Sequence, residues 1–437
     1  MAPQNFKVII VGSGPIGIVT AHALSKSNID YVVFEKGAEV APTNGSGHMI
    51  FPNTLRFLDQ IGILPQVASA GKEVYTKSNF LKDGTTHGEI DLGQLCLDNH
   101  GYKPIYFQRS HLIQALYDAL PVEDKSKIKT STKVTNIEVT ETGVRVTLAD
   151  GKVEEGSIII GCDGIYSQTR QTALDLANAA GKGKKLDGLP YKSVIRSYVF
   201  RRDWPTPDKD RCLMWETRSG GLAAQGFAQK ESLIVALFEH LDVPKEGYSR
   251  FSEEEKEAFK KRFVDIHLNE SLTVGDVMEN DKINWDFFAD QEEGKSDIVQ
   301  YGGRIVLAGD SVHKITPISG LGLNMGVQQS IALVNRLNGV LSTNQSPSSA
   351  TLEEAFKLFE KDCAKTLAKT LELNTILGDG VTWANWPAWF IDRVAAPWIG
   401  LKFIVTKFYS KDILRHGFVL NSLPKDGLKQ GQVAWVS

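Results

Sequence analysis

The chain has 437 residues, of which 42% are apolar and 23% charged, with a formal net charge of −3. This length exceeds one average hydrophobic core and predicts two domains with an appendage. The balanced charge gives no general attraction to nucleic acid, which we exclude as a partner. The four cysteines form no C-x-x-C pair, so we expect no metal site and no disulfide scaffold, and a reducing, cytoplasmic location.

The first 35 residues carry the pattern of a βαβ unit. The apolar run 6–11 predicts a buried strand, the stretch 18–25 a helix, and 31–34 a second strand. A glycine-rich turn joins the first strand to the helix, and an acidic residue closes the second strand. A G-x-G-x-x-G pattern in this context is typical of dinucleotide binding, whereas the same pattern alone is weak evidence.

Each residue of this turn has a physical role in the predicted site. Gly12 permits the tight turn, Gly14 lets the backbone approach a pyrophosphate, and Gly17 lets the helix pack closely on the strand. Glu35 is placed to accept hydrogen bonds from the ribose hydroxyls of adenosine. Because its charge would repel a phosphate on that ribose, FAD or NAD fits this site better than NADP.

A second glycine-rich loop lies late in the chain, at residues 309–324. It follows a short apolar run, 304–308, and precedes the helical pattern of 325–341. Strand, loop and helix in this order aim backbone N–H groups at an anionic or electron-rich ligand. Asp310 stands where the strand ends, at the sheet edge where open α/β folds bind cofactors. We therefore interpret this loop as the holder of the redox end of a flavin.

Two other positions fit the same sheet edge less specifically. Asp163 and Gly164 follow a predicted strand at 157–160, so they either mark a simple turn or join the cofactor site. Arg109 opens an amphipathic helix, where it either reaches a phosphate or the flavin, or only caps and solvates the helix start. The spacing alone leaves both alternatives open.

Between residues 191 and 288 the pattern changes to strand-like runs and a charged helix, 253–267, and residues 74–98 predict hairpins. These features predict an α/β fold: a Rossmann-type FAD-binding domain with a second, mainly antiparallel-sheet substrate domain and a C-terminal helical tail. The predicted limits are 1–75, 101–185 and 296–375 for the FAD-binding domain, 76–100 for a substrate-domain hairpin, 186–295 for the substrate domain and 376–437 for the tail.

The tail is rich in tryptophan and in basic residues. Its stretch 383–409 is apolar but interrupted by charges, so it is not predicted to span a membrane. Aromatic and basic residues on a helix either make peripheral contact with a membrane interface or pack as a cap on the body, and we favour the cap.

Taken together, the motifs resemble those of the group A FAD-dependent monooxygenases of the aromatic-hydroxylase fold. The chain is most similar to the fungal secondary-metabolite branch, which includes meroterpenoid and indole-diterpene epoxidases. Three motifs carry the resemblance: the first glycine turn with Glu35 and Lys36, the Asp163-Gly164 turn, and the loop from Gly309 through Asn324. They span residues 6 to 335.

The resemblance implies roles for individual residues. Glu35 would bind the adenosine ribose, Arg109 the middle of the cofactor and Asp163 the pyrophosphate region. Asp310 would hold the ribityl chain. The other expected cofactor contacts are Gly12, Gly14, Gly17, Lys36, Pro317, Gly320, Gly322 and Asn324, with the backbone around Met49 and Leu323 lining the flavin.

The resemblance also implies one catalytic residue, and the chain departs from the family pattern at two places. Arg196 matches a position where this branch often has an active-site arginine, although pairing with a carboxylate is a nearly equal alternative. After Asn324 the family commonly carries an acidic pair, where this chain has Gln328 and Gln329. Near residues 214–217 relatives tend to show a tyrosine, and this chain has none there.

The resemblance implies a reaction in which NADPH or NADH reduces FAD and O2 adds to give the flavin C4a-hydroperoxide. Oxygen is then transferred to an apolar secondary metabolite, prenylated, terpenoid or polyketide, as an epoxide or a hydroxyl. Two alternatives stay open. One is a non-redox cyclase that uses FAD as a scaffold, and the other is a non-catalytic flavin-fold binding protein.

Overall fold

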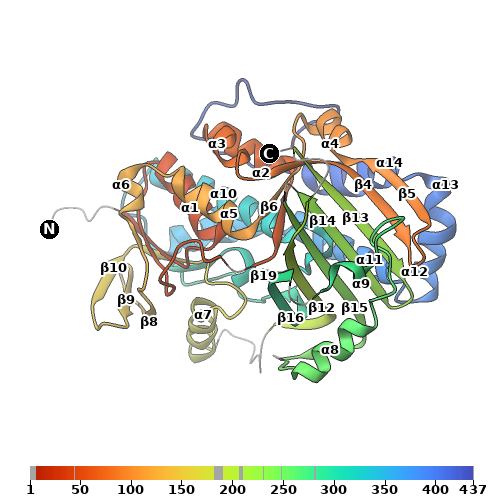
Figure 1. The fold of residues 1–437 in the computed structure, drawn as a ribbon. Coiled ribbons are helices and arrows are strands. Elements are labelled where there is room, and N and C mark those ends of the chain that lie inside the picture. Colours follow the sequence, from red (N-terminus) through yellow and green to blue (C-terminus); the bar gives the residue numbers. More distant parts are fainter. Residues whose placement is uncertain are drawn as a thin grey trace.

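The computed structural model describes residues 6–43, 45–181, 190–205, 210–229, 231–247, 249–279 and 282–436. Two halves lie side by side, each built on a large sheet, and helices from the end of the chain flank the second half (Figure 1). This arrangement confirms the predicted fold class. The predicted limit between residues 185 and 186 lies outside the described residues, and the domain limits stay a prediction.

The sheet of the first half positions the cofactor motifs. Its six strands, in spatial order, are β17 (Gln300–Tyr301), β18 (Ile305–Leu307), β11 (Ile158–Gly161), β1 (Lys7–Val11), β2 (Asp30–Phe34) and β7 (Ile128–Lys129). All neighbours pair in parallel except β17 with β18. Val11 pairs with Gly161, and Gly161 with Leu307. The three glycine-marked turns therefore leave the same edge of the sheet, as the sequence predicts.

The sheet of the second half is mainly antiparallel. Its strands, in spatial order, are β19 (His313–Lys314), β16 (Ile283–Lys295), β12 (Tyr191–Asp203), β15 (Ser232–Glu246), β14 (Leu222–Gln229), β13 (Arg211–Ser219), β4 (Lys72–Leu81), β6 (Ile105–Gln108) and β3 (Gly47–Ile50), with β5 (Thr86–Asp91) paired to β4. The pairing of β13 with β4 is parallel and joins segments more than 130 residues apart. This sheet thus contains strands from both predicted domains.

Helices cover both sheets, and three further strands, β8 (Val134–Val139), β9 (Val144–Leu148) and β10 (Val153–Gly156), form a small separate sheet. The α-helices are α1 (Pro15–Lys26), α2 (Pro52–Gln60), α3 (Leu64–Ala68), α4 (Leu92–His100), α5 (Arg109–Asp118), α6 (Val122–Lys125), α7 (Gln168–Ala179), α8 (Glu253–Lys261), α9 (Val274–Val277), α10 (Gly322–Leu341), α11 (Ser349–Thr382), α12 (Trp386–Phe390), α13 (Ala396–Ile399) and α14 (Leu401–Ile404). Short 3-10 turns η2 (Gly309–Ser311) and η3 (Pro317–Ser319) and π-helical segments η4 (Ile391–Ala395) and η5 (Val405–Leu414) complete the chain.

One local prediction differs from the structure. Residues 74–98 form a hairpin, β4 and β5, but α4 takes the place of a further strand. The Asp91 side chain caps this helix by accepting a hydrogen bond from the Gln94 N–H at 2.7 Å, and Gly101, at φ 81°, ends it. Residues 92–100 are thus flanked by a start signal and a stop signal of a short helix.

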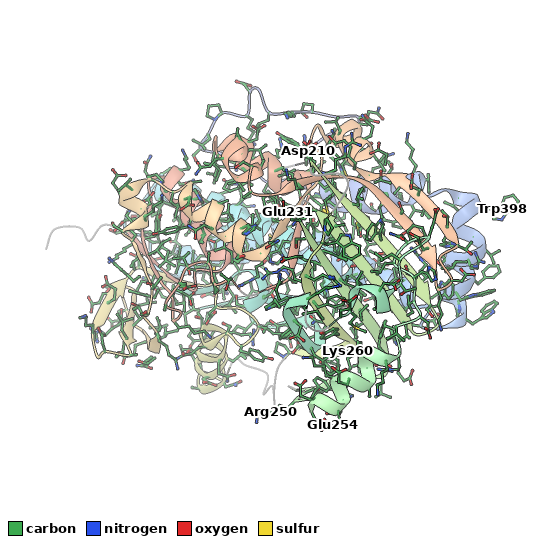
Figure 2. The ribbon with its side chains drawn as sticks, viewed as in Figure 1. Asp210, Glu231, Arg250, Glu254, Lys260 and Trp398 are labelled. Atoms are coloured by element: carbon green, nitrogen blue, oxygen red, sulfur yellow. The ribbon has the colours of Figure 1, made fainter. Side chains whose placement is uncertain are left out.

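The tail divides into two parts that behave differently. Residues 415–436 pack along α2: the Gln60 side chain donates to the Leu420 carbonyl at 2.9 Å, and Trp435 lies against Arg56 and His100. This part packs on the body, as the favoured cap alternative expects, but residues 415–436 contain no helix, so the predicted helical form is wrong here. The segment 386–411 instead exposes aromatic side chains, among them Trp398, which points away from the body (Figure 2). None of the described helices is long and apolar enough to cross a membrane.

Candidate cofactor and substrate site

One large cavity, of about 1490 Å³, lies between the two sheets. Its first half is lined by the turns that follow β1, β11 and β18, and its second half by the antiparallel sheet and the C-terminal helices. Pockets for small ligands typically have volumes of about 300–1,000 Å³. The cavity is therefore large enough to hold a dinucleotide together with a second molecule.

The first glycine turn is shaped for a ligand, not only for packing. A Cβ on Gly17 would lie 2.0 Å from the Gly12 carbonyl oxygen, and Gly12 itself has φ +98°. Both glycines are thus required by the fold. A Cβ on Gly14 would meet no protein atom within 4 Å, although Gly14 lines the cavity. The free space beside the Gly14 backbone fits the pyrophosphate of FAD, as the sequence predicts.

Glu35 closes β2 and its carboxylate lies beside this turn. It accepts hydrogen bonds from the backbone N–H groups of Ser13 at 2.8 Å and Gly37 at 2.7 Å. These contacts fix the carboxylate where a ribose hydroxyl would donate to it. Lys36 lines the same part of the cavity.

Charged groups converge at the far end of the cofactor half. Lys314 donates to Asp310 at 2.8 Å. Burial raises the pKa of Asp310, but Lys314 outweighs it and keeps the pKa below its usual value, so the carboxylate is ionised. Burial lowers the pKa of Arg109, and the charges of Glu35 and Asp310 oppose this shift. Arg109 lines the same cavity as these two carboxylates, which favours cofactor contact over a purely local role at the start of α5.

His48, on β3, lines the same region and was not identified from the sequence. Burial, together with the positive charge of Arg109, lowers the pKa of His48 to about 4, so the imidazole is neutral at pH 7. A single histidine within the loop 43–49 carries no sequence pattern that would have indicated this position.

Two predicted residues brace the site through polar contacts. Asp163 accepts hydrogen bonds from the Ser167 hydroxyl at 2.5 Å and from the Thr169 N–H at 3.0 Å, and so holds the turn that enters α7. Asn324 accepts from the Phe51 N–H at 2.9 Å and donates to the Met49 carbonyl at 2.8 Å. Asn324 therefore joins the late loop to β3.

Most of the expected cofactor contacts meet in this cavity. Two are placed behind its wall: Gly17 packs on Gly12, and Asn324 supports Met49. The cavity-lining members are Gly12, Gly14, Glu35, Lys36, Met49, Arg109, Asp163, Asp310, Pro317, Gly320, Gly322 and Leu323. Their individual contacts with FAD stay predictions. The described residues contain no cluster of histidine, cysteine, aspartate or glutamate suited to a metal ion.

Arg196 is not among the residues that line the cavity, so its expected role as an active-site arginine stays a prediction without support from the cavity geometry. On β12 the side chains alternate between faces: Val199 lines the cavity, whereas Arg196 lies on the face that carries Phe251 and Phe288. Its guanidinium pairs with Asp290 at 2.8 Å and stacks 4.4 Å from the centre of the Phe251 ring. These contacts match the alternative that the sequence left open, in which Arg196 pairs with a carboxylate.

The second half of the cavity is mainly apolar. Its walls include Val199, Met214 and Phe227 from the sheet, with Leu377 and Val405 from the C-terminal helices. A group of charged and polar side chains interrupts this surface: Lys77, Glu216, Arg218, Gln225 and Asp392. This group could not be recognised from the sequence, because its members come from four separate segments that only the tertiary fold brings together.

The geometry agrees with comparisons to known proteins. Residues 5–354 match the family model described as "FAD binding domain". The chain is 32% identical to the FAD-dependent monooxygenase srdH of Neurospora crassa, with 99% of each chain covered. It is 31% identical to the FAD-dependent monooxygenase spyC of Aspergillus fumigatus, over 80% of this chain and 73% of that protein.

Solved structures show the same fold at low sequence identity. Klebsiella pneumoniae HpxO, complexed with FAD and uric acid, superposes with a TM-score of 0.68 at 16% identity, covering 90% of this chain and 93% of that chain. Pseudomonas aeruginosa PqsL, in complex with 2-aminobenzoylacetate, gives 0.67 at 16% identity, covering 86% and 97%. With the family match over most of its length, this chain belongs to the FAD binding domain family and is an FAD-dependent monooxygenase of the fungal secondary-metabolite type.

Proposed function

We propose that the enzyme takes electrons from NADPH or NADH and uses O2 to epoxidise or hydroxylate an apolar secondary metabolite, prenylated, terpenoid or polyketide. The observation that supports this substrate class is the apolar second half of the cavity. Val199, Met214 and Phe227 line it beside the loop 317–320, which the sequence assigns to the redox end of the flavin. An apolar ligand that fills this half removes water from the reacting end.

FAD, when bound, supplies the electron transfer and oxygen activation that no side chain provides. The chain's own residues bind and orient. Glu35 would bind the ribose and Asp310 the ribityl chain, and the backbone N–H groups between Pro317 and Asn324 would stabilise negative charge at the reduced ring. The apolar walls hold the substrate and exclude water.

Product analysis with labelled oxygen tests the proposal. The holoenzyme is incubated with NADPH, 18O-labelled O2 and a panel of prenylated phenols and linear polyketides, and the products are analysed by mass spectrometry. The expected product carries one labelled oxygen atom. An isomerised product without label, formed without NADPH, would instead establish the cyclase alternative. Failure to hold FAD would favour the non-catalytic binding protein.

We also propose peripheral membrane contact through the segment 386–411. Its exposed apolar side chains include Trp386, with 70% exposure, and Trp398, with 90%. The segment's basic residues, Arg393, Lys402, Lys407 and Lys411, are exposed. Its single acidic residue, Asp392, is paired with Arg218. Aromatic and basic groups without exposed acids suit an anionic lipid surface.

Vesicle sedimentation tests this contact. The protein should sediment with phosphatidylcholine vesicles that contain phosphatidylserine, and less with vesicles that lack it. Trp398→Ser should reduce the bound fraction, whereas Val122→Ser, which changes an exposed residue on α6, should not. Equal binding by both variants would refute a specific role for the segment.

A further inference from the structure

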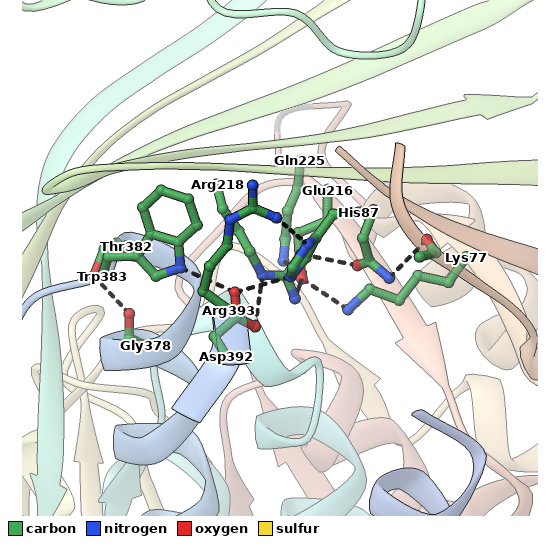
Figure 3. Close-up of polar contacts among 12 residues, drawn as sticks. Lys77, His87, Glu216, Arg218, Gln225, Gly378, Thr382, Trp383, Asp392 and Arg393 are labelled. Atoms are coloured by element: carbon green, nitrogen blue, oxygen red, sulfur yellow. Dashed lines mark hydrogen bonds and ion pairs between the residues drawn. The ribbon is translucent and has the colours of Figure 1, made fainter. Parts of the chain in front are cut away.

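The charged group in the second half of the cavity is the least expected feature of the site. We refer to Lys77, Glu216, Arg218, Gln225 and Asp392 as the polar cluster, and Figure 3 shows their contacts. All five line the cavity. Buried ion pairs contribute little net stability, because desolvation offsets their attraction. Stability alone therefore does not account for these charged side chains in an otherwise apolar wall, and a role in binding would.

Glu216 is the centre of the cluster. Its Oε1 lies 3.0 Å from Lys77 Nζ and 2.9 Å from Arg218 Nη2, and its Oε2 accepts from Gln225 at 2.8 Å. Burial raises the pKa of Glu216, but Lys77 and Arg218 outweigh it, so the pKa lies below its usual value and the group is ionised. The side chain is 2% exposed. The carboxylate of Glu216 is thus engaged by Lys77, Arg218 and Gln225 and is not exposed to solvent.

Gln225 places the cluster beside the predicted flavin wall. Its Nε2 contacts Glu216 and also lies 3.4 Å from the carbonyl oxygen of Ile318, within η3. A substrate group bound by the cluster would therefore lie next to the reacting end of the cavity, and would decide which carbon of the substrate faces that end.

Lys77 is the member with free hydrogen-bonding capacity. An ammonium has three N–H donors, and Glu216 is the one ion-pair partner of Lys77 among the described residues. Its side chain is 23% exposed and borders the cavity, whereas that of Arg218 is 8% exposed. Arg218 is also occupied by Asn79 at 3.1 Å and by Asp392 at 3.0 Å.

The charges of the cluster cancel. Lys77 and Arg218 carry two positive charges, and Glu216 and Asp392 carry two negative charges. An anionic ligand would add an uncompensated charge among apolar walls, which costs free energy. A neutral acceptor oxygen would not, and it would accept a charge-assisted hydrogen bond from the ammonium.

We propose that Lys77 binds a neutral carbonyl or hydroxyl oxygen of the otherwise apolar substrate, and so sets its orientation in the cavity. This inference rests on the proposed function for the apolar character of the substrate. It adds a polar anchor and a preference for a neutral oxygen over a carboxylate.

Ligand titration of the FAD-loaded enzyme tests the anchor, with the flavin absorbance spectrum as the reporter. The probes are geranylacetone, the hydrocarbon with the same carbon skeleton, and geranylacetic acid. Lys77→Met keeps the length of the side chain and removes the donors. A hydrogen bond to a charged group is expected to change affinity by about 10- to 100-fold. Lys77→Met should therefore raise the Kd for the ketone by at least about 10-fold and leave the Kd for the hydrocarbon within about 2-fold.

Lys82→Met is the matched control, because Lys82 follows β4 directly and is exposed. It should change neither Kd. An unchanged ketone Kd in Lys77→Met would overturn the proposal, as would an equal loss for ketone and hydrocarbon. Tighter wild-type binding of geranylacetic acid than of the ketone would overturn the preference for a neutral oxygen. Binding needs no oxygen transfer, so failure here is distinguishable from failure of the labelled-oxygen experiment.

Discussion

Gly14 and Gly17 offer a direct test of whether the first turn is built for the fold or for a ligand. The two residues are three positions apart, and both line or support the same turn. Their surroundings differ sharply: an added Cβ on Gly17 would lie 2.0 Å from a backbone oxygen, whereas one on Gly14 would meet no protein atom within 4 Å. We expect Gly17→Ala to damage the fold and Gly14→Ala to damage only cofactor binding.

The magnitudes follow from these distances. Gly17→Ala forces α1 away from the turn, and overpacking of this kind costs about 1–3 kcal/mol, against a gain of about 1 kcal/mol in helix propensity. A net loss of up to about 2 kcal/mol in the free energy of unfolding is expected. Gly14 has φ −59° and ψ 177°, which alanine adopts freely, so Gly14→Ala should leave the stability of the FAD-free protein unchanged or raise it by about 0.4–1 kcal/mol.

Two measurements separate the effects. Denaturant unfolding of the FAD-free protein reports stability, and quenching of flavin fluorescence on titration reports the Kd for FAD. Gly14→Ala should weaken FAD binding by about 10-fold or more, because its methyl group occupies the space beside the turn. If Gly14→Ala binds FAD with wild-type affinity, the pyrophosphate does not lie at this turn and the assignment fails.

Three other tests address buried polar groups. Arg196→Met should lower the free energy of unfolding by about 3 kcal/mol, because it leaves Asp290 without its ion-pair partner. It should leave kcat unchanged, because Arg196 is not among the cavity-lining residues. A large fall in kcat would support a catalytic role. Gln329 accepts a hydrogen bond from the Gly309 N–H at 3.0 Å. Gln329→Leu should therefore lower the free energy of unfolding, measured with denaturant, by about 1–3 kcal/mol. Gln329→Glu should lower it less, since a carboxylate keeps the acceptor. Burial lowers the pKa of each of His22, His100 and His313 from 6.5 to about 4. Because the unfolded chain binds more protons in this window, stability should fall as the pH drops from 6.5 to 4, by up to about 3 kcal/mol per histidine, and a flat unfolding profile across that range would contradict it.

Local patterns were sufficient where neighbouring residues decide the structure. The strand at 6–11, the helix after Gly17 and the second strand ending at Glu35 follow from apolar spacing and from one glycine turn, and the structure contains β1, α1 and β2 there. The shared edge of the three turns was also predictable, since parallel strands place their carboxyl ends together. These elements position most of the expected cofactor contacts.

Positions that depend on strand register or on distant pairing were not predictable. Arg196 was assigned from family resemblance, but a shift of one residue along β12 reverses the face on which its side chain lies. The ion pair of Lys77 with Glu216 depends on the parallel pairing of β4 with β13, across more than 130 residues. A hint existed in the sequence, since Glu216 and Arg218 stand at alternate positions of one strand and therefore share a face.

The hydrogen bonds of Gln328 and Gln329, behind the late loop, show why glutamine fits these two positions. Gln328 is 1% exposed; its amide donates to the Asn53 carbonyl at 3.1 Å and its oxygen accepts from the Phe418 N–H. A carboxylate at this position accepts but does not donate, so it would lose the first contact when ionised. Gln328 thus joins α2 to the packed part of the tail, while Gln329 holds Gly309. The glutamines in place of an acidic pair therefore have structural roles in this chain, and they are no evidence for the non-redox cyclase.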